Sequence, residues 1–495
     1  MPDLFSIPEI VAAILTTDTV EHASLRNCLQ VNRLFSREAT RILWDRCGGS
    51  FPYTNPSRHK VPTVYDLANI AARNVSRAQY YANFVRKLRF IRGPENWPKV
   101  TEQDQWHDHL LNLHFPVLEA FTSDGSTHLT GEELDAFRST GPFYDFHSSE
   151  RTGLFWHVLR SSPNLKSIDL GMDEPESFQT IEEEAIAFIN STLALSSLSL
   201  SHVHRGGEDT PINTWSPGIL GSLAALPVFC KLQGQYLCAK SLQNLPGGSF
   251  PALNEIATRY SGLLAILPPL FPHLSVLRLE LSEPINEGLG RLAALSNLTH
   301  LDLIFAETST ISGADLMALA YGCPHLTTVN LPSASVLMMD DAGPRGVDIN
   351  DATIEAFARA LPNLDTFCIG LEDRSALTHQ AIISLARHCP ELSYFHITAD
   401  VFIPDLIDGL KRIGDTPLKS MCFMRFYLPE DVQHTYEDPT GFAEQLVYKL
   451  APQLCEFSIN DGSENDTEFG DFVENLLLLP SRWGIHEQGE TETEG

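Results

Sequence analysis

A short phrase recurs along the chain and constrains its fold more than any other feature. The phrase is Pro-x-Leu with apolar residues three and five positions after the leucine, as in 163-PNLKSIDL-170 and 272-PHLSVLRL-279. Further copies stand at 296-SNLTHLDL-303, 324-PHLTTVNL-331, 362-PNLDTFCI-369, 390-PELSYFHI-397, 417-PLKSMCF-423 and 452-PQLCEFSI-459. The two later apolar positions alternate with polar ones, so both point inward from a short strand. The leading leucine packs from the turn that enters the strand.

The spacing of these copies predicts a repeat array with insertions. The leading leucines of the best run are Leu274, Leu298, Leu326, Leu364, Leu392, Leu418 and Leu454, at intervals of 24, 28, 38, 28, 26 and 36 residues. A structural repeat of this kind has a period of roughly 20–29 residues. The two long intervals therefore predict insertions, one of them at 338–348, which is polar and contains Gly and Pro.

Helix-like segments separate the predicted strands. They lie at 314–323, 352–361, 379–389 and 442–450. In the second, Ile354, Phe357, Ala358 and Leu361 fall on one helical face, and Asn350 or Asp351 can cap its start. The proline that follows each helix ends it. Strand, loop and helix therefore alternate, which predicts an α/β fold: a curved solenoid with parallel strands on its concave face and helices outside.

Two of these units carry a recognisable signature. The units at 311–331 and 377–397 resemble the cysteine-containing class of leucine-rich repeat. The residues that carry the resemblance are Leu316, Leu319, Ala320, Cys323, Pro324 and Leu326, and then Ile382, Leu385, Ala386, Cys389, Pro390 and Leu392. The Asn or Cys that usually follows the strand is replaced in two copies by Ala306 and Ala334. The resemblance implies a leucine-rich-repeat solenoid.

The N-terminal residues 4–47 lack the repeat phrase. Their apolar spacing predicts three short helices, over 7–15, 22–35 and 37–47. A helical segment of this size does not bury enough apolar surface to be stable alone, so it requires a partner or a neighbouring domain.

The order of residues in this segment resembles the F-box motif, with the spelling found in basidiomycete fungal F-box proteins. The matching residues are Ile7, Pro8, Glu9, Ile10, Ile14, Leu15, Leu25, Cys28, Val31, Asn32, Arg33, Ala39, Leu43 and Trp44. The resemblance implies that this segment binds a Skp-type adaptor, which bridges to a cullin–RING ubiquitin ligase. The predicted adaptor-binding residues are Ile7, Pro8, Ile10, Ile14, Leu25, Val31 and Leu43. Packing of the three helices against one another is the alternative role for each of them.

The resemblance also implies a division of labour. The repeats would hold a protein substrate near the ubiquitin-charged enzyme, and the chain itself would catalyse nothing, acting by proximity. The substrate is not identified by the sequence. Candidate contact positions lie between the inward leucines: Ser275, Arg278, Thr299, Asp302, Thr327, Asn330, Asp365 and Cys368. Solvated side chains that merely cover the sheet are the alternative interpretation of these positions.

The charge of the chain limits the classes of partner. Lys and Arg number 34 against 63 Asp and Glu, a formal net charge of −29. Nucleic acid and anionic membranes require basic surfaces, so we expect neither as a partner; a basic substrate is one hypothesis that fits. There is no long apolar run and no basic segment before an N-terminal apolar one. Nine scattered cysteines indicate reduced thiols. We therefore expect a cytoplasmic and/or nuclear protein.

No motif predicts a metal, a cofactor or an active site. His107, His109 and His114 lack a completing carboxylate pair, and the acidic loop 461–468 lacks the glycine and the final glutamate of a calcium loop. We expect no catalytic, cofactor-binding or metal-binding residues.

The predicted organisation is an F-box at 4–47, a connecting region at 48–110, a repeat solenoid at 111–460 and a terminal segment at 461–495 with an acidic tail. Two further functions stay open. One is a leucine-rich-repeat scaffold or inhibitor without a ubiquitin role, whose N-terminal helices cap the solenoid. The other is an F-box protein that binds the adaptor without recruiting a cullin.

Overall fold

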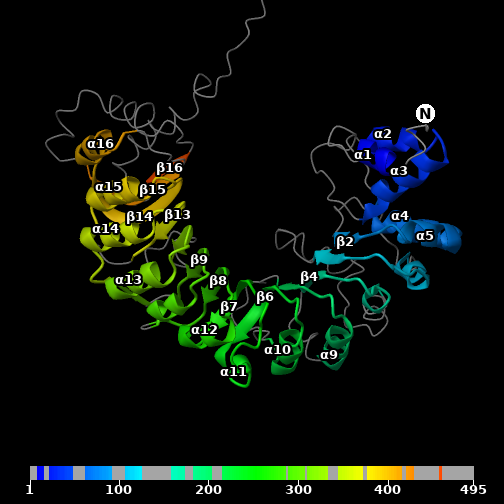
Figure 1. The fold of residues 1–495 in the computed structure, drawn as a ribbon, viewed down its shortest axis with the longest axis horizontal. Coiled ribbons are helices and arrows are strands. Elements are labelled where there is room, and N and C mark those ends of the chain that lie inside the picture. The colour runs from blue at the N-terminus through cyan, green and yellow to red at the C-terminus, as the bar shows by residue number, and fades with distance from the viewer. Residues whose placement is uncertain are drawn as a thin grey trace, which may run out of the picture. The chain divides into compact units, whose positions relative to one another are not determined.

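The structure is a computed structural model of the chain. It describes residues 8–15, 22–47, 62–91, 106–124, 158–172, 182–202, 215–285, 288–306, 309–332, 344–371, 376–414, 420–427 and 456–459. The chain divides into two compact units, residues 1–236 and 237–495. In each unit, parallel strands stack side by side and helices cover one face of the sheet (Figure 1).

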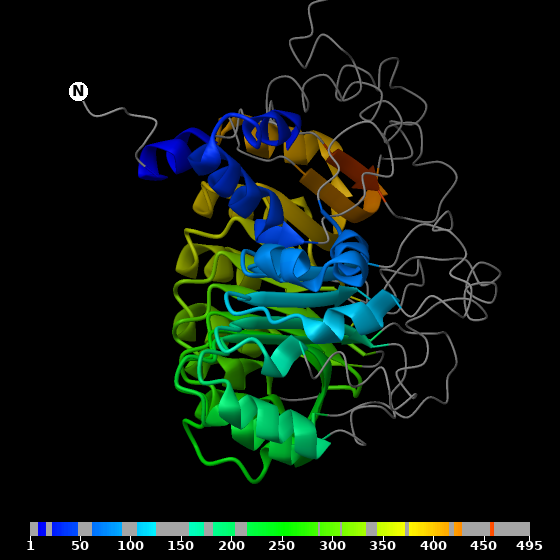
Figure 2. The ribbon, with the colours of Figure 1, turned by 90° about the vertical axis from the view of Figure 1, so that its right-hand side faces the viewer.

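The N-terminal unit begins with three helices and continues as a parallel sheet. The helices are α1 (Pro8–Leu15), α2 (His22–Cys28) and α3 (Arg33–Asp45), and the strand order is β1-β2-β3-β4-β5-β6. The strands are β1 (Arg46–Cys47), β2 (Lys87–Ile91), β3 (Ala120–Asp124), β4 (Ser167–Met172), β5 (Ser197–His202) and β6 (Lys231–Cys238). Between them lie α4 (Val64–Arg73), α5 (Val75–Ala82), the 3-10 helix η2 (Trp106–Asn112), α9 (Glu182–Ser191) and α10 (Pro217–Ala224). Figure 2 views this unit from the front.

The C-terminal unit repeats the same alternation. Its main sheet has the order β7-β8-β9-β11-β13-β14-β15-β16, all parallel where paired. The strands are β7 (Glu255–Ser261), β8 (Val276–Leu281), β9 (His300–Ile304), β11 (Thr328–Leu331), β13 (Thr366–Ile369), β14 (Tyr394–Phe402), β15 (Ser420–Tyr427) and β16 (Glu456–Ile459). The helices are α11 (Ala239–Leu242), η3 (Leu264–Ile266), α12 (Leu267–Leu270), η4 (Leu289–Ala294), α13 (Gly313–Gly322), α14 (Asp351–Ala360), α15 (His379–His388) and α16 (Ile403–Lys411).

The repeat phrase builds the core as its spacing predicts. In the copy that starts at Leu298, that leucine and its two partners Leu301 and Leu303 are each 0% exposed. The same three positions are buried in the copies that start at Leu274, Leu326, Leu364 and Leu392. Complete burial of one leucine side chain contributes about 1.5–3 kcal/mol, so each repeat is stabilised mainly by these positions. The phrase and the parallel sheet together give the chain a leucine-rich-repeat solenoid fold.

The predicted helices between the strands are confirmed where the structure describes them. They are α13, α14 and α15, and Asn350 caps α14 by accepting a hydrogen bond from the Thr353 amide at 3.0 Å. Ile354, Phe357 and Ala358 face the core with no exposed surface. The predicted helix at 442–450 and the loop at 461–468 lie outside the described residues.

The prediction of a second helix over 22–35 is wrong at its C-terminal end. Helix α2 stops at Cys28, and α3 begins at Arg33. The reason is local: the Asn32 side chain accepts hydrogen bonds from the amides of Leu34 (2.9 Å) and Phe35 (3.0 Å). An asparagine in extended conformation with two such bonds starts a new helix, so a turn over residues 29–31 separates the two.

The structure also refines the predicted insertion after Leu331. Within it, β12 (Arg345–Val347) pairs in parallel with β10 (Thr310–Ser312), as a separate two-stranded sheet. Gly313, which follows β10, lies against the Asp348 carbonyl: a Cβ there would come within 2.6 Å of that oxygen. Residues 345–348 of the insertion therefore pack against the repeat at 309–332.

In the described part of the chain, no helix is long and apolar enough to cross a membrane. No disulfide forms among the cysteines whose side chains are described.

Candidate functional site

The three N-terminal helices pack through a few buried side chains. Val11 and Leu15 of α1, Leu25 of α2, and Ala39 and Leu43 of α3 are all at most 6% exposed. Both α1 and α2 contact α3. Leu25 and Leu43, which the F-box resemblance places among the adaptor-binding residues, are therefore part of the small helical core.

The other predicted adaptor-binding residues have different positions. Val31 is 61% exposed, in the turn between α2 and α3. Pro8, Ile10 and Ile14 lie in α1, whose backbone the structure describes, and Ile7 lies outside the described residues. Of the seven predicted residues, Val31 is the one whose described side chain is available to a partner.

Sequence reasoning did not place Leu29, which lies near Val31 in the same turn, among the adaptor-binding residues. Its side chain is 37% exposed. The predicted second helix over 22–35 would have placed residue 29 one helical turn after the buried Leu25 and so on the core face. The asparagine at position 32 was the signal that the helix stops earlier, since asparagine is among the preferred N-cap residues. Leu29 and Val31 together form what we call the apolar turn.

The helical segment is joined to the first repeat. Strand β1 pairs in parallel with β2, with Arg46 opposite Lys87 and Cys47 opposite Leu88. The ring of Trp44, at the end of α3, stacks on Tyr81 of α5 at a centroid distance of 4.8 Å and an interplanar angle of 8°. Stacked aromatic pairs add about 0.5–1.5 kcal/mol to the burial of their area. The three helices therefore extend the repeat array at its N-terminal end.

The outward face of the C-terminal sheet is the second candidate site. Side chains of this face alternate with the inward leucines and align in rows across the strands. One row runs through Ala257, Arg278, Asp302, Asn330, Cys368 and His396. Within this row, the Asn330 Nδ2 donates to Asp302 Oδ1 at 3.0 Å. Burial raises the pKa of Asp302, while Arg278 and the Asn330 hydrogen bond oppose that rise.

A second pair adds charge to the same face. Arg259 of β7 and Glu280 of β8 are register partners, and Arg259 Nη2 lies 2.7 Å from Glu280 Oε1. Both side chains are more than a third exposed, so the pair contributes little to stability. Exposed Arg278, Arg259 and Glu280 thus present fixed charges to any partner of β7 and β8.

Several of the candidate substrate-contact positions have a structural role. The hydroxyl of Ser275 donates to the Asn254 carbonyl at 3.0 Å, and that of Thr299 to the Ser275 carbonyl at 2.9 Å. Thr327 donates in turn to the Thr299 carbonyl at 3.1 Å. These positions precede each strand and form a ladder in which each repeat donates to the one before it. The Ser393 hydroxyl, at the corresponding position before β14, donates instead to the Asp365 carboxylate at 2.6 Å.

The last residue of this row whose side chain the structure describes is a buried histidine. His396 of β14 is 8% exposed, and its Nε2 atom has no hydrogen-bond partner. Burial lowers the pKa of this imidazole. Cys368, its register partner on β13, is 5% exposed. These two side chains are therefore inaccessible to a partner in this conformation, and the accessible part of the row lies between Arg278 and Asn330.

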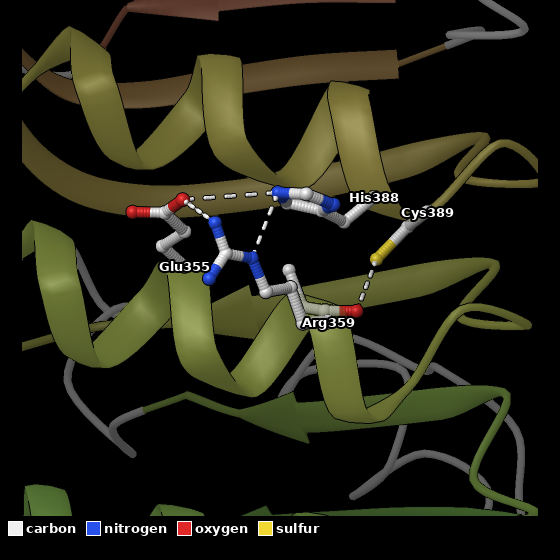
Figure 3. A network of polar contacts seen from close by, with 5 residues as sticks. Glu355, Arg359, His388 and Cys389 are labelled. Atoms are coloured by element: carbon white, nitrogen blue, oxygen red, sulfur yellow. Dashed lines mark hydrogen bonds and ion pairs between the residues drawn. The ribbon is translucent and has the colours of Figure 1, made fainter.

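The helix side of the C-terminal unit contains a polar network that joins two repeats (Figure 3). Arg359 of α14 pairs with Glu355 on the same helix at 2.5 Å, and its Nε lies 3.4 Å from His388 Nε2 of α15. Behind them, the Cys389 thiol donates to the Leu361 carbonyl at 3.4 Å. Burial raises the pKa of Cys389 to about 12, so this thiol stays protonated and unreactive. The network is structural and exposes no nucleophile.

Among the residues that the structure describes, no three His, Cys, Asp or Glu side chains lie close enough to hold a metal ion. His109 and His114 lie at and after η2, and the His114 amide donates to Gln79 Oε1 at 2.8 Å.

No protein-family model matches the chain, and no curated protein sequence matches it. Three solved structures are similar to it at low identity. The TLR13–ssRNA13 complex is 14% identical, with 64% of this chain and 40% of that chain covered and a TM-score of 0.34. The yeast Rad7–Elc1 complex is 15% identical, with 80% and 90% covered and a TM-score of 0.38. The leucine-rich-repeat protein LegL7 of Legionella pneumophila is 12% identical, with 64% and 92% covered and a TM-score of 0.30. The chain spans less than half the length of the first.

Proposed function

We propose that the chain is the substrate-recognition subunit of a Skp–cullin–F-box ubiquitin ligase. In this proposal the N-terminal helices bind a Skp-type adaptor, the adaptor recruits the cullin, and the repeats bind a protein substrate. The observation that carries the proposal is the apolar turn. Leu29 and Val31 are 37% and 61% exposed, within the segment whose residue order resembles an F-box.

The apolar turn has the properties of a preformed binding element. It is held between two helices, and the Asn32 cap fixes where the second helix starts. Burial of two aliphatic side chains against a partner contributes about 25 cal/mol for each Å² of apolar surface removed from water. Leu25 and Leu43 are already buried in the helical core. A partner can therefore bury Leu29 and Val31 without any rearrangement of the helices that hold the turn.

The structure also supports the assignment of the repeats to substrate binding. The outward face of the C-terminal sheet presents Arg259, Arg278 and Glu280 on adjacent strands. Fixed charges on a rigid sheet give specificity and faster association more than affinity. The substrate itself is not named by these residues.

The test is a binding measurement between the full chain and a purified Skp-type adaptor. The variant Leu29→Asp with Val31→Asp places two charges in the apolar turn, and we expect affinity to fall by about a hundredfold or more, as for the loss of buried interface anchors. The matched control is Leu193→Asp with Leu263→Asp, which changes two leucines that are 70% and 68% exposed elsewhere. Point variants are preferable to deletion of residues 1–50, since deletion also removes β1 and Trp44 from the first repeat.

The outcomes separate the candidate functions. Adaptor binding that is lost in the turn variant but kept in the control supports the proposal. Absence of adaptor binding by a folded chain would overturn it. The scaffold or inhibitor function would then be favoured, and the β1–β2 pairing and the Trp44–Tyr81 stack specifically support a capping role for the helices. Adaptor binding without co-purification of a cullin would favour an F-box protein that acts outside ubiquitination.

A further inference from the structure

Lysine does not occur in a long central part of the chain. The sequence has 25 arginines and nine lysines, the latter at positions 60, 87, 99, 166, 231, 240, 411, 419 and 449. None of the nine lies in the 170 residues from 241 to 410, although 170 of 495 residues is about a third of the chain and an even distribution would place three there. We call residues 241–410 the lysine-free stretch. It contains seven arginines, at positions 259, 278, 291, 345, 359, 374 and 387.

The lysine-free stretch contains the candidate substrate surface. It includes all of β7, β8, β9, β11, β13 and β14, together with the helices from η3 to α15. The outward face of these strands carries the row from Ala257 to His396 and the Arg259–Glu280 pair. The connections between these elements belong to the same continuous stretch, so no ε-amine is attached to this part of the repeats.

At two positions the local geometry accounts for arginine. The guanidinium of Arg259 bonds both carboxylate oxygens of Glu280, with Nε 2.8 Å from Oε2 and Nη2 2.7 Å from Oε1. Arg359 pairs with Glu355 and also donates through Nε to His388 Nε2 at 3.4 Å (Figure 3). Lysine carries one ammonium group on a flexible stem and lacks this planar fork.

At three other positions the local geometry does not require arginine. Arg278 of β8, Arg291 of η4 and Arg387 of α15 are exposed, and within the described part of the chain no hydrogen bond depends on their guanidinium groups. Arg278 acts on Asp302 through its charge, and a lysine carries the same charge. The use of arginine at these positions therefore points to a property other than charge or hydrogen-bond geometry.

The two basic side chains differ in their reactivity toward a thioester. In ubiquitin transfer, the neutral ε-amine of a lysine attacks the thioester carbonyl at the C-terminus of ubiquitin. A C–N bond forms, the C–S bond breaks, the enzyme's cysteine leaves as a thiolate and the amine nitrogen gives up a proton to solvent. The guanidinium of arginine stays protonated in proteins and does not act as this nucleophile.

We propose that the lysine-free stretch protects the chain from the ligase in which it acts, so that ubiquitin passes to the bound substrate and not to the repeats that hold it. The proposal rests on the function proposed above and concerns its regulation. A subunit that acts by proximity brings its own repeats, as well as its substrate, near the ubiquitin-charged enzyme. A lysine at position 278 would stay there permanently, whereas a substrate lysine is present only while the substrate is bound.

The test is ubiquitin transfer in a reconstituted ligase that contains the full chain, a Skp-type adaptor, a cullin–RING complex, the activating and conjugating enzymes, and ubiquitin. The variant is Arg278→Lys with Arg291→Lys and Arg387→Lys, which adds three exposed amines and keeps the net charge at −29. Mass spectrometry locates ubiquitin on individual lysines. We expect the introduced lysines to be modified and the ubiquitin on the chain to rise by about fivefold or more, because a tethered amine reacts at a high effective concentration.

The matched control is Arg278→Gln with Arg291→Gln and Arg387→Gln. It removes the same three guanidinium groups without adding an amine, so its ubiquitin transfer should equal that of the unmodified chain. An amine-reactive ester, used without the ligase, should label all three introduced lysines and so show that they are accessible. Where circular dichroism shows that the triple lysine variant is misfolded, the single substitution Arg278→Lys gives the same comparison.

The outcomes distinguish this inference from the proposed function. A chain that does not bind the adaptor, or a complete ligase that transfers no ubiquitin to the chain or to free ubiquitin, would overturn both. Transfer to the exposed Lys240 or to free ubiquitin, with the introduced lysines labelled by the ester but never by ubiquitin, would overturn this inference alone. An equal rise in ubiquitin on the glutamine control would also overturn it, because loss of the arginines rather than gain of amines would then be the cause.

Discussion

The residue that ends each repeat helix differs between the two units, although its place in the phrase is the same. In the N-terminal unit it is a hydroxyl residue, Ser162 or Thr192, and both are buried. In the C-terminal unit it is a cysteine in two repeats, Cys323 and Cys389, and both are completely buried. All four precede the leucine of the phrase by three positions. Their hydrogen-bond partners, however, lie in different repeats.

The hydroxyls bond within their own repeat. Ser162 Oγ donates to the Val158 carbonyl at 2.6 Å, four residues earlier, and Thr192 Oγ1 donates to the Phe188 carbonyl at 3.0 Å. Each hydroxyl therefore satisfies one of the carbonyls that a helix C-terminus leaves without an amide partner.

The thiols bond to the preceding repeat instead. Cys323 Sγ lies 3.3 Å from the Leu295 carbonyl, and Cys389 Sγ lies 3.4 Å from the Leu361 carbonyl. Burial raises the pKa of Cys323 to about 11, which keeps the thiol protonated and able to donate. The side chain at this one position of the repeat can therefore form a hydrogen bond either within its own helix or with the preceding repeat. Because repeat arrays are stabilised by nearest-neighbour contacts, the thiol adds to cooperativity and the hydroxyl does not.

The largest expected effect concerns a repeat junction of the N-terminal unit. Gly234 of β6 has φ of +87°, and a Cβ there would lie 1.8 Å from the Leu200 carbonyl oxygen of β5. We expect Gly234→Ala to destabilise the N-terminal unit by about 3 kcal/mol or more, since both backbone strain and overlap must be relieved. Hydrogen exchange resolved by mass spectrometry should show lost protection in β5 and β6 with the C-terminal unit unchanged.

The matched control for that experiment is Gly221→Ala in α10. Nothing lies within 4 Å of a Cβ at Gly221. Alanine in a helix interior is better than glycine by about 0.5–1 kcal/mol, so this variant should be slightly more stable. Equal destabilisation by both substitutions would contradict the assignment of the effect to the β5–β6 contact.

A smaller effect on stability is expected when the thiol or the hydroxyl at the end of a repeat helix is replaced. In Cys389→Ser the shorter side chain loses the hydrogen bond that joins the two repeats, while the Leu361 carbonyl keeps the Leu364 amide as a donor at 3.2 Å. We expect a loss of about 1 kcal/mol with a broader urea transition of the C-terminal unit. Ser162→Ala should cost about 1 kcal/mol in the N-terminal unit without broadening the transition. If the dependence of the unfolding free energy on urea concentration is unchanged in Cys389→Ser, the thiol does not couple neighbouring repeats and the distinction between the two units is wrong.

The smallest expected effect is a difference in pH dependence. His396 is buried, and its pKa is below the ordinary value of about 6.5, so the unfolded chain binds more protons than the folded one in the window between the two values. The stability of the C-terminal unit should therefore fall as pH drops through that window. His396→Leu should abolish this part of the dependence, as measured by thermal unfolding between pH 5 and pH 8. The exposed His325→Leu serves as the control, and an identical response of both variants would refute the assignment.

Much of the fold was predictable because the pattern that specifies it is local. The inward leucines, the helices α13 to α15 and the strands up to β16 follow from spacing and from proline positions. The boundary between α2 and α3 was misjudged because apolar periodicity continued through residues 29–35, while one side-chain cap at Asn32 decided where the helix begins.

The candidate sites were less accessible to sequence reasoning. Residue order pointed to the helical segment, but only packing separates Leu25 and Leu43, which are buried, from Val31, which is exposed. Ser275, Thr299 and Thr327 looked like contact positions and instead form the ladder that joins repeats. The pairing of β1 with β2 places Arg46 beside Lys87, which is 41 residues later in the chain, and no local pattern indicates this register.

By itself the sequence determined the α/β repeat, its period and its inward leucines, because those depend on which residues recur at two- and three-residue spacings within one short segment. The tertiary structure decided which polar side chains remain accessible, which hydroxyls and thiols join neighbouring repeats, and which charges gather. Those properties depend on contacts between segments tens of residues apart, and hydrogen-bond partners and burial are set only when the repeats stack.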